Sequence, residues 1–567
     1  MDAKSAYLAR PWLRFYEPGV APEVDVPLCS AADLFDAATE KFSAKAALIF
    51  YGREITFKEL RDHTDRLADS LSKLGLKKGD RIALYLLNSP QYVIAYFATL
   101  KLGCTVTPIS PVYTSHEVRF QLEDSGARTI ICQDILYEKV GKSGVVLDHV
   151  IVTGISEYLP GLKKLLGKTF LAKIFGAIPA SAAVPDAPNI VQFQDLIAKG
   201  APGFKSVPID PKNDLASLPY TGGTTGNPKG VMLTHYNLIA AQVAGRAAFP
   251  GFEEGKEVII AFLPFFHIYG QVVIMLNGLT MGSTLILFTT PQTEEIVEAI
   301  SKYHATVFYG VPTLYEYLKD HKDTGKVNWK QMKLVLSGAD TLHESTAQGW
   351  HKRTGSTITE GYGLTECAAS AHVNPRNRTK AGSFGIPVPN VLAAVIDADS
   401  GAFVPVGETG ELILKGPSVM QGYWNKPGEN ARIFIEIDGE KWLRTGDIVR
   451  MDEEGYFHFH DRSKDLIKYK GYSVFATDIE HVLYEHDRIK AAGVIGVSDP
   501  EVGQRIKAIV VLQPEARGKL TEEDILAYCK EKLAHYKVPH IVEFRGELPK
   551  TDVGKVSRRE LRDEHAA

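Results

Sequence analysis

The sequence predicts an α/β protein, with a large N-terminal domain of layered α/β subdomains and a small C-terminal α+β domain. At 567 residues the chain is too long for a single hydrophobic core. Apolar strands alternate with helical segments over most of its length, which is typical of layered, largely parallel sheets. Near residue 461 this pattern gives way to a segment dense in lysine and glycine. We therefore predict domains at 1–461 and 462–567.

Hydrophobic periodicity locates the elements of the larger domain. Thr56 and Glu59 have the spacing of a capping box, and the leucines that follow share one helical face. The uncharged stretch 258–292 is broken by prolines and glycines, so we expect a buried helix and a buried strand there rather than a membrane span. The expected elements include a helix from 56, strands at 80–87, 105–110 and 283–288, and helices at 91–102 and 268–281.

The smaller domain has its own succession of elements. An alternating strand, "GYFHFHDR", precedes the boundary, and the residues after it are numerous enough to form an independent core. We expect a helix at 477–486, strands at 490–497 and 505–513, a helix at 521–534, a strand at 540–545 and a terminal helix.

Composition excludes several functional classes. The formal net charge is −4, whereas a nucleic-acid-binding protein normally presents a basic surface, so no nucleic-acid partner is expected. The five cysteines are scattered and form no CxxC pair, which favours a reduced cytoplasmic compartment without disulfides or a zinc site. The N-terminus has no apolar run of signal-peptide length, so secretion is not expected.

The basic stretch 159–179 raises the question of membrane contact. Lys163, Lys164, Lys168 and Lys173 stand among leucines and phenylalanines, with no acidic residue between them. Such a segment can lie on a membrane surface, or it can be a solvated excursion whose apolar side packs on the body of the protein. We expect a cytoplasmic protein, which the first alternative would place peripherally at the inner membrane face.

The loop "YTGGTTGNPKG" at 220–230 has the chemistry of a phosphate-binding turn. A Walker P-loop requires Ser or Thr directly after the lysine, but Gly230 occupies that position. Glycines nonetheless let backbone N–H groups point at an anion, while threonine hydroxyls add donors and a lysine adds charge. The residues predicted to bind phosphate are Thr221, Gly222, Gly223, Thr224, Thr225, Gly226 and Lys229.

The same loop resembles the signature loop of the adenylate-forming superfamily, which includes acyl-CoA synthetases, luciferases and the adenylation domains of peptide synthetases. The resemblance extends from about residue 30 to the C-terminus. One departure is Gly222, where many members have serine and long-chain fatty acyl-CoA synthetases often have glycine. The further matching motifs are "LPFFHIYG" (263–270), "LSGAD" (336–340), "EGYGLTE" (360–366), "WLRTGD" (442–447), "DRSKDLIKYKGY" (461–472) and "LPKTDVGK" (548–555).

The resemblance implies a two-step reaction and its ligands. A small-molecule carboxylate would attack the α-phosphorus of ATP to give acyl-AMP and pyrophosphate, and the thiol of coenzyme A would then displace AMP. Because two anions meet in the first step, cations and hydrogen-bond donors must stabilise its transition state. ATP, Mg²⁺ and coenzyme A are therefore implied, together with the family's distorted barrel in the large domain and its mobile small domain.

The nucleotide-binding residues are implied by matching the motifs residue by residue. Glu366 resembles the residue that helps to hold magnesium on the phosphates, and Thr365 would donate to a phosphate. Asp447 resembles the carboxylate that binds both ribose hydroxyls, with Arg462 in support. The residues that would frame the adenine and complete the ATP site are Gly338, Ala339, Asp340, Glu360, Gly361 and Tyr362.

Catalysis and domain movement are implied in the same way. Lys555 would bridge the substrate carboxylate and the α-phosphate during adenylation. Lys464 stands at the family's domain hinge, about which the small domain would rotate between the two steps. Lys468 would then enter the site for the second step, and Lys470 and Gly471 would line the path of the pantetheine chain.

The predicted acyl pocket bears on the substrate class. His267 belongs to the aromatic–histidine motif that closes this pocket in the family, and Val311 and Gly338 would line it. Acetate-specific relatives have an aromatic residue at the place of Gly363, so glycine there would leave room for a larger acyl group. Together with Gly222 and the basic stretch, this favours a medium-to-long-chain fatty acid, with an aromatic or alicyclic carboxylate as the alternative.

Other functions within the superfamily stay open at this point. An acyl-AMP ligase that serves a carrier protein would show little activity with free coenzyme A, and no carrier domain is attached in this chain. A luciferase-type oxygenase would depend on oxygen. A non-catalytic binder with the same fold is disfavoured, because every expected catalytic position is filled.

Overall fold

The structure is a computed structural model of the chain. It describes residues 2–160, 181–221, 228–290, 293–462, 465–470, 472–499, 501–551 and 556–566. Several predicted features lie outside the described residues: the phosphate loop at 222–226, Lys464, Gly471, Lys555 and the basic stretch after Pro160.

The chain divides into two compact units. Unit 1 comprises Met1–Pro11, Ala393–Leu414 and Arg444–Ala567, and unit 2 comprises Trp12–Leu392 and Lys415–Leu443. The domain boundary at 461–462 stays a prediction, because unit 1 holds residues from both sides of it.

The first sheet of unit 2 has the order β17-β16-β15-β14-β13-β11-β12-β1-β2. The steps from β15 through β14 and β13 to β11 are all parallel. Parallel neighbours need crossover connections, and helices α11, α12 and α13 supply them. The strands are β1 (Ala46–Phe50), β2 (Arg53–Thr56), β11 (Val258–Ala261), β12 (Thr284–Leu287), β13 (Val307–Gly310), β14 (Leu334–Ser337), β15 (Thr359–Tyr362), β16 (His372–Val373) and β17 (Ile386–Pro387), and the helices are α11 (Thr293–Lys302), α12 (Pro312–Asp320) and α13 (Glu344–Thr354).

The second sheet of unit 2 has the order β20-β10-β8-β4-β3-β5-β6-β7, with β9 paired to β10. Its strands are β3 (Arg81–Tyr85), β4 (Thr105–Pro108), β5 (Thr129–Gln133), β6 (His149–Thr153), β7 (Ile190–Gln192), β8 (Leu215–Ser217), β9 (Tyr220–Thr221), β10 (Lys229–Thr234) and β20 (Gly422–Tyr423). Further helices of this unit are α2 (Ala31–Lys41), α3 (Phe57–Lys73), α4 (Pro90–Lys101), α5 (Ser115–Ser125), α6 (Tyr137–Ser143), α8 (Phe193–Lys199), α9 (His235–Ala247), α10 (Asn277–Thr280) and α14 (Pro427–Ile433).

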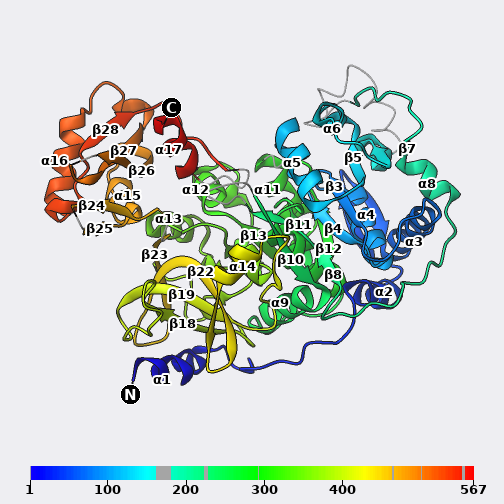
Figure 1. Cartoon of the computed structure of the whole chain (residues 1–567), viewed down its shortest axis with the longest axis horizontal. Helices are drawn as coiled ribbons and strands as arrows, with labels where there is room; N and C mark the ends of the chain where they lie inside the picture. Colours follow the sequence, from blue (N-terminus) through cyan, green and yellow to red (C-terminus); the bar gives the residue numbers. More distant parts are fainter. Residues whose placement is uncertain are drawn as a thin grey trace. The chain divides into compact units, whose positions relative to one another are not determined.

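Helices α3 and α4 show why the sequence pattern locates these elements. The side chain of Thr56 caps α3 by accepting the N–H of Glu59, but the carboxylate of Glu59 pairs with Arg53, so only half of the predicted capping box forms. Leu60, Leu67 and Leu71 of the predicted leucine face are buried, whereas Leu74 is the C-cap and only partly buried. Every residue of α4 is buried, as expected for a helix that is apolar all round. Figure 1 shows α3, α4 and α8 grouped beside β3 and β4.

The predicted helix at 268–281 forms with a different geometry. Residues Tyr269–Leu276 adopt a π-helix, which continues as the α-helix α10. A Cβ at Gly270 would overlap the carbonyl oxygen of Pro264, so only glycine permits this close approach of the chain. Hydrophobic periodicity cannot distinguish a π-helix from an α-helix. Single π-helical turns are frequent at functional sites.

A third sheet contains the strands that surround the "WLRTGD" motif. Its order is β18-β19-β22-β21, with β23 paired to β22. The strands are β18 (Leu392–Ile396), β19 (Thr409–Lys415), β21 (Phe434–Ile437), β22 (Glu440–Met451) and β23 (Phe457–Arg462).

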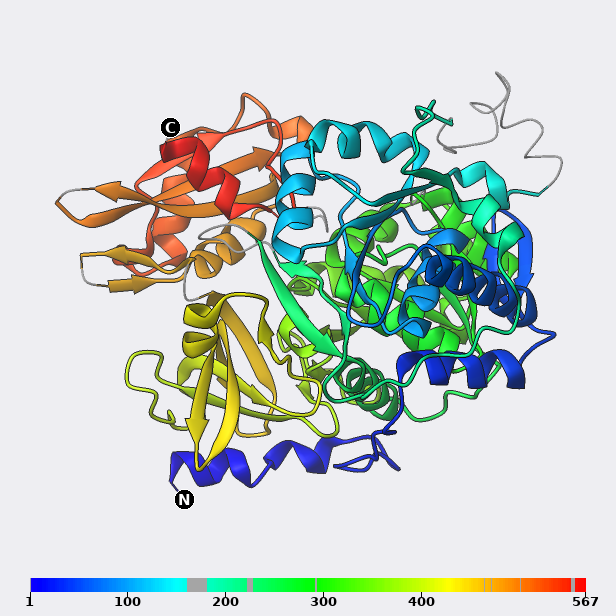
Figure 2. The same ribbon diagram turned by 45° about the vertical axis from the view of Figure 1, so that its right-hand side comes forward.

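The fourth sheet, in unit 1, confirms the predicted α+β succession near the C-terminus. Its order is β25-β24-β27-β26, with β28 paired to β27. Figure 2 shows the long paired strands β26 and β27 in orange and the terminal helix α17 in red. The elements are β24 (Ile467–Tyr469), β25 (Tyr472–Val474), α15 (Ala476–Tyr484), β26 (Ile489–Asp499), β27 (Gly503–Leu512), α16 (Glu522–Lys532), β28 (Ile541–Phe544) and α17 (Arg558–Ala566), and the unit also contains α1 (Ala3–Leu8).

None of the helices among the described residues is both long enough and apolar enough to span a bilayer. The uncharged stretch 258–292 instead supplies the buried strands β11 and β12 and the π-helix between them. The prediction that this stretch is a buried helix and strand is therefore confirmed.

Candidate active site

Predicted pocket and nucleotide residues of unit 2 meet at one edge of the first sheet. Val311 follows β13, Gly338 follows β14 and Gly363 follows β15, while β11 leads into the loop that carries His267. These four strands are consecutive neighbours in the sheet and run in parallel. Ligands of open α/β sheets bind at the carboxyl ends of the strands, so this edge is where a substrate site is expected.

The two pocket glycines lie against different neighbours. A Cβ at Gly338 would come within 3.2 Å of the ring of Tyr269, so the π-helix packs closely against this turn. A Cβ at Gly363 would overlap the carbonyl oxygen of Ala369. The backbone of the following loop therefore fills the Cβ direction of Gly363. Its contribution to acyl selectivity stays a prediction.

The turn after β14 carries residues predicted to bind ATP, and the strand β15 carries those predicted to frame the adenine. Ala339 adopts a positive φ of 72°, and Asp340 is exposed. The carboxyl group of Glu360 is buried and accepts the N–H of Leu342 at 3.2 Å. Burial raises the pKa of Glu360 to about 8, and the charge of Asp340 adds to this shift. Glu360 is therefore largely protonated at neutral pH.

Tyr362 and His267 are both held within aromatic surroundings. Tyr362 packs on Phe384, with ring centroids 4.5 Å apart, and lies 5.7 Å from the ring of His372. Nδ1 of His267 accepts the N–H of Tyr269 at 3.3 Å, at the start of the π-helix. Both predicted residues are therefore oriented by contacts within unit 2, and Gly361 lies between Glu360 and Tyr362 on β15.

The structure brings the two residues that flank the phosphate loop close to Glu366 of the "EGYGLTE" motif. Thr221 and Lys229 face each other across the β9–β10 pair, directly before and after the loop. Glu366 lies in the 3-10 helix Thr365–Cys367 and accepts the hydroxyl of Tyr423 at 2.7 Å. Nζ of Lys229 lies 5.1 Å from the ring centroid of the same tyrosine. Lys229 and Glu366 thus share one contact residue.

Sequence reasoning missed Tyr423 and Glu429. Nζ of Lys229 is 2.6 Å from Oε2 of Glu429 on α14, and this pairing lowers the pKa of Glu429. The stretch "GYWNKPGEN" holds both residues, but neither shows a chemical signal without its spatial neighbours.

The residues around Glu366 suit a magnesium ion that nucleotide phosphates would largely hold. Within the described ranges, no three His, Cys, Asp or Glu side chains gather into a metal site. Mg²⁺ commonly uses one or two carboxylates together with substrate phosphates, so the single oriented carboxylate of Glu366 fits that role.

The predicted ribose-binding pair forms within unit 1. Asp447 on β22 is directly opposite Arg462 on β23, and Nε of Arg462 lies 3.2 Å from Oδ1 of Asp447. Asp447 is 5% exposed, and its N–H donates to the hydroxyl of Thr445. The antiparallel register of the hairpin therefore fixes the pair.

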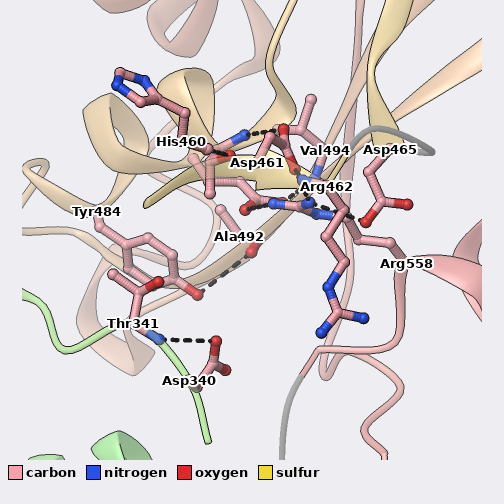
Figure 3. A network of polar contacts seen from close by, with 12 residues as sticks. Asp340, Thr341, His460, Asp461, Arg462, Asp465, Tyr484, Ala492, Val494 and Arg558 are labelled. Atoms are coloured by element: carbon pink, nitrogen blue, oxygen red, sulfur yellow. Dashed lines mark hydrogen bonds and ion pairs between the residues drawn. The ribbon is translucent and has the colours of Figure 1, made fainter. Parts of the chain in front are cut away.

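A buried ionic cluster in unit 1 was not expected from the sequence. The guanidinium of Arg558 binds Asp461 at 2.8 Å and Asp465 at 3.3 Å (Figure 3). It also pairs with both carboxylate oxygens of Glu480. Arg562 pairs with Asp465 at 2.7 Å. Asp461 and Asp465 stand on either side of the predicted hinge, and Arg558 begins the helix that follows the Lys555 loop.

The predicted CoA-side lysines lie on β24 and the turn after it. The side chain of Lys468 is exposed, and its N–H donates to the side chain of Gln504 at 2.8 Å. Lys470 is exposed and adopts a positive φ of 47°, and its N–H donates to the carbonyl of Val502. The roles of these lysines stay predictions.

Two family models match the chain. A model of the AMP-binding enzyme family matches residues 35–424, and a model of the AMP-binding enzyme C-terminal domain matches residues 478–555. The chain therefore belongs to the AMP-binding enzyme family, which confirms the resemblance found in its motifs.

Similar proteins define the enzyme class more closely. A long-chain-fatty-acid–CoA ligase of Bacillus subtilis is 38% identical, with 98% of each chain covered, and one of Escherichia coli is 36% identical with the same coverage. A probable 4-coumarate–CoA ligase of Dictyostelium discoideum is 30% identical, over 90% of this chain and 91% of that one. Within its family the chain is an adenylate-forming acyl-CoA ligase.

Solved structures share the fold over nearly the whole chain. ATP-bound MatB from Rhodopseudomonas palustris has a TM-score of 0.80 at 27% identity, covering 94% of this chain and 99% of that one. The anthranilate CoA ligase AuaEII with anthranoyl-AMP has a TM-score of 0.80 at 27% identity, covering 95% and 98%. A benzoate CoA ligase from Burkholderia xenovorans has a TM-score of 0.79 at 27% identity, covering 94% and 100%. The predicted α/β fold class is confirmed.

Proposed function

We propose that this enzyme converts a medium-to-long-chain fatty acid into its CoA thioester. The observation that carries the proposal is the convergence of the His267 loop, Val311, Gly338 and Gly363 at one sheet edge of unit 2. The curated relatives named as long-chain-fatty-acid–CoA ligases, at 36–38% identity over nearly full length, support the acyl class.

In the first step an oxygen of the fatty carboxylate attacks the α-phosphorus of ATP, and pyrophosphate leaves. Lys229 and Thr221 would bind the phosphates together with the loop at 222–226, and Thr365 would donate to a phosphate oxygen. Lys555 would neutralise the approach of the two anions. Preorganised donors of this kind stabilise charge that develops in the transition state.

Glu366 would hold Mg²⁺, which supplies charge neutralisation on the phosphates when it is bound. Asp447, oriented by Arg462, would accept hydrogen bonds from the ribose hydroxyls. Glu360, Gly361 and Tyr362 would frame the adenine, and Gly338, Ala339 and Asp340 would complete the ATP site. In the second step the CoA sulfur attacks the acyl carbonyl and AMP leaves. Lys468 would act in this step, Lys470 and Gly471 would line the path of the pantetheine chain, and Lys464 would be the hinge.

An aromatic carboxylate is the second candidate substrate. The 4-coumarate–CoA ligase relative and the anthranilate and benzoate CoA ligases among the structural neighbours favour it. The relatives named for long-chain fatty acids have higher identity over more of the chain, so the fatty acid stands first.

The test is CoA-dependent AMP release across a panel of acetate, octanoate, palmitate, oleate, benzoate and 4-coumarate. Higher kcat/KM for the fatty acids of eight or more carbons would support the proposal, and preference for benzoate or 4-coumarate would replace it. Activity that requires an acyl-carrier protein in place of CoA would overturn the CoA ligase assignment.

The two-step mechanism has a separate test. Lys555→Ala should lose acyl-AMP formation by about a hundredfold to a thousandfold, as for loss of one preorganised donor, while preformed acyl-AMP still gives thioester. Lys468→Ala should form acyl-AMP but transfer it slowly. Equal loss of both steps in both variants would contradict an alternating small domain.

Peripheral membrane contact through 159–179 remains part of the proposal. Removing the four lysine charges of this stretch should weaken binding to anionic vesicles, because each basic residue near such a surface contributes about 1 kcal/mol. Turnover of a water-soluble acid should not change. Equal vesicle binding by the wild type and the variant would mean that 159–179 is a surface segment that does not contact the membrane.

A further inference from the structure

The segment from Met420 to Asn430 contacts the side chain and the main chain of Glu366. It comprises β20 and the start of α14. The hydroxyl of Tyr423 donates to Oε1 of Glu366 at 2.7 Å, and the N–H of Met420 donates to the carbonyl oxygen of Glu366 at 2.9 Å. Glu366 is therefore held at two points by residues more than fifty positions away in the chain.

Tyr423 is itself fixed by its neighbours. Its N–H donates to Oδ1 of Asn430 at 2.6 Å, and its carbonyl oxygen accepts Nδ2 of the same side chain at 2.9 Å. It also pairs with Val231 where β20 meets β10. These contacts fix the position from which the Tyr423 hydroxyl donates to Glu366.

The same segment also contacts the cation at the end of the phosphate loop. Glu429 pairs with Nζ of Lys229 at 2.6 Å, and the ring of Tyr423 lies 5.1 Å from that nitrogen. Residues of this one short stretch thus contact both Glu366 and Lys229, the carboxylate and the ammonium that are predicted to act at the ATP phosphates.

We propose that Tyr423 is a positioning residue for acyl-AMP formation, whose hydroxyl fixes the orientation of the Glu366 carboxylate toward the metal–nucleotide complex. The proposal rests on the proposed role of Glu366. Groups that hydrogen-bond to a metal-ligating carboxylate fix its direction, and their loss typically costs tenfold to a hundredfold in metal affinity or activity.

The variant Tyr423→Phe tests this role because it removes only the hydroxyl. We expect acyl-AMP formation, measured by pyrophosphate release, to fall about tenfold or more, and half-saturation to require about tenfold more Mg²⁺. Thioester formation from preformed acyl-AMP should stay within twofold of the wild type. A purely structural role would lower both steps together and leave the magnesium dependence unchanged.

Equilibrium binding gives a readout that does not depend on turnover. Mn²⁺ binding to the enzyme with a non-hydrolysable ATP analogue, followed by electron paramagnetic resonance, should weaken about tenfold in Tyr423→Phe. The matched control is Tyr158→Phe, which removes another buried hydroxyl of unit 2 that bonds to His63 at 3.0 Å. This control should bind Mn²⁺ as the wild type does.

Two outcomes would overturn the proposal in distinguishable ways. Normal Mn²⁺ binding and normal magnesium dependence in Tyr423→Phe, with Glu366→Gln impaired in both, would remove Tyr423 from the mechanism but leave Glu366 in it. Normal Mn²⁺ binding and acyl-AMP formation in Glu366→Gln would instead show that the proposed role of Glu366 is wrong. Weakened binding in both variants, with a normal Tyr158→Phe, would support the positioning role.

Discussion

The two units hold the segments that carry their predicted functional residues by different means. In unit 2, Val311, Gly338 and Gly363 reach one sheet edge because parallel strands end together there. In unit 1, Asp461 and Arg558 belong to a buried cluster of charged side chains. Backbone packing therefore constrains the first region and charge balance constrains the second. The first should be sensitive to added volume, and the second to a lost charge.

Removal of Arg558 should have the largest effect on stability. Arg558→Met leaves Asp461, Asp465 and Glu480 without their shared cation, and breaking a buried ionic cluster typically costs about 3–5 kcal/mol. Hydrogen exchange of the β26 amides should report this loss in unit 1. Arg562→Met is the control, because among the described residues Arg562 pairs with Asp465 only, and it is more exposed than Arg558. Equal effects of the two variants would contradict a central role for Arg558.

Added volume at Gly363 should damage unit 2 next. Gly363→Ala forces a Cβ against the carbonyl of Ala369, and overpacking of this kind typically costs about 1–3 kcal/mol, here at the upper end because backbone must move. Acyl-AMP formation should fall alike for acetate and palmitate. Gly546→Ala, where a Cβ meets open space, is the control. Selective loss of the long acids would instead favour the predicted specificity role.

Neutralising Asp447 should weaken ATP binding by about the free energy of one hydrogen bond to a charged group. Such bonds contribute about 1.5–3 kcal/mol, so Asp447→Asn should raise the KM for ATP about tenfold to a hundredfold. Asp452→Asn, directly after β22, where the carboxylate hydrogen-bonds with His458, serves as the control. An unchanged KM for ATP would show that Asp447 does not bind the ribose.

Glu360 is a buried ionisable group in unit 2, where the other site residues are held by backbone packing. Its folded-state pKa, raised to about 8 by burial, exceeds that of the unfolded chain, so the folded state keeps its proton where the unfolded state has lost it. Stability should therefore fall with rising pH between about 4.5 and 8, by at most about 1.4 kcal/mol per pH unit. Denaturant unfolding followed by the tryptophans of unit 2 measures this slope. Glu360→Gln should flatten it, and an unaltered slope would place the titration elsewhere.

The sequence by itself determined the elements and the order of the motifs. The leucine spacing of α3 and the apolar run of α4 reappear as buried faces, because periodicity reports which side of an element leaves water. The succession of elements near the C-terminus followed for the same reason. Motifs such as "EGYGLTE" and "WLRTGD" identified the family because local backbone chemistry requires specific residues at fixed spacing.

Only the tertiary structure decided how these residues are held. The sequence does not reveal that the backbone of Ala369 fills the Cβ direction of Gly363. Neither the contact of Tyr423 with Glu366 nor that of Arg558 with Asp461 has a local sequence signature, because each joins residues that are far apart in the chain. The raised pKa of Glu360 likewise depends on burial by surrounding elements. Periodicity and motifs describe neighbours along the chain, whereas orientation, burial and charge pairing arise only when distant segments pack together.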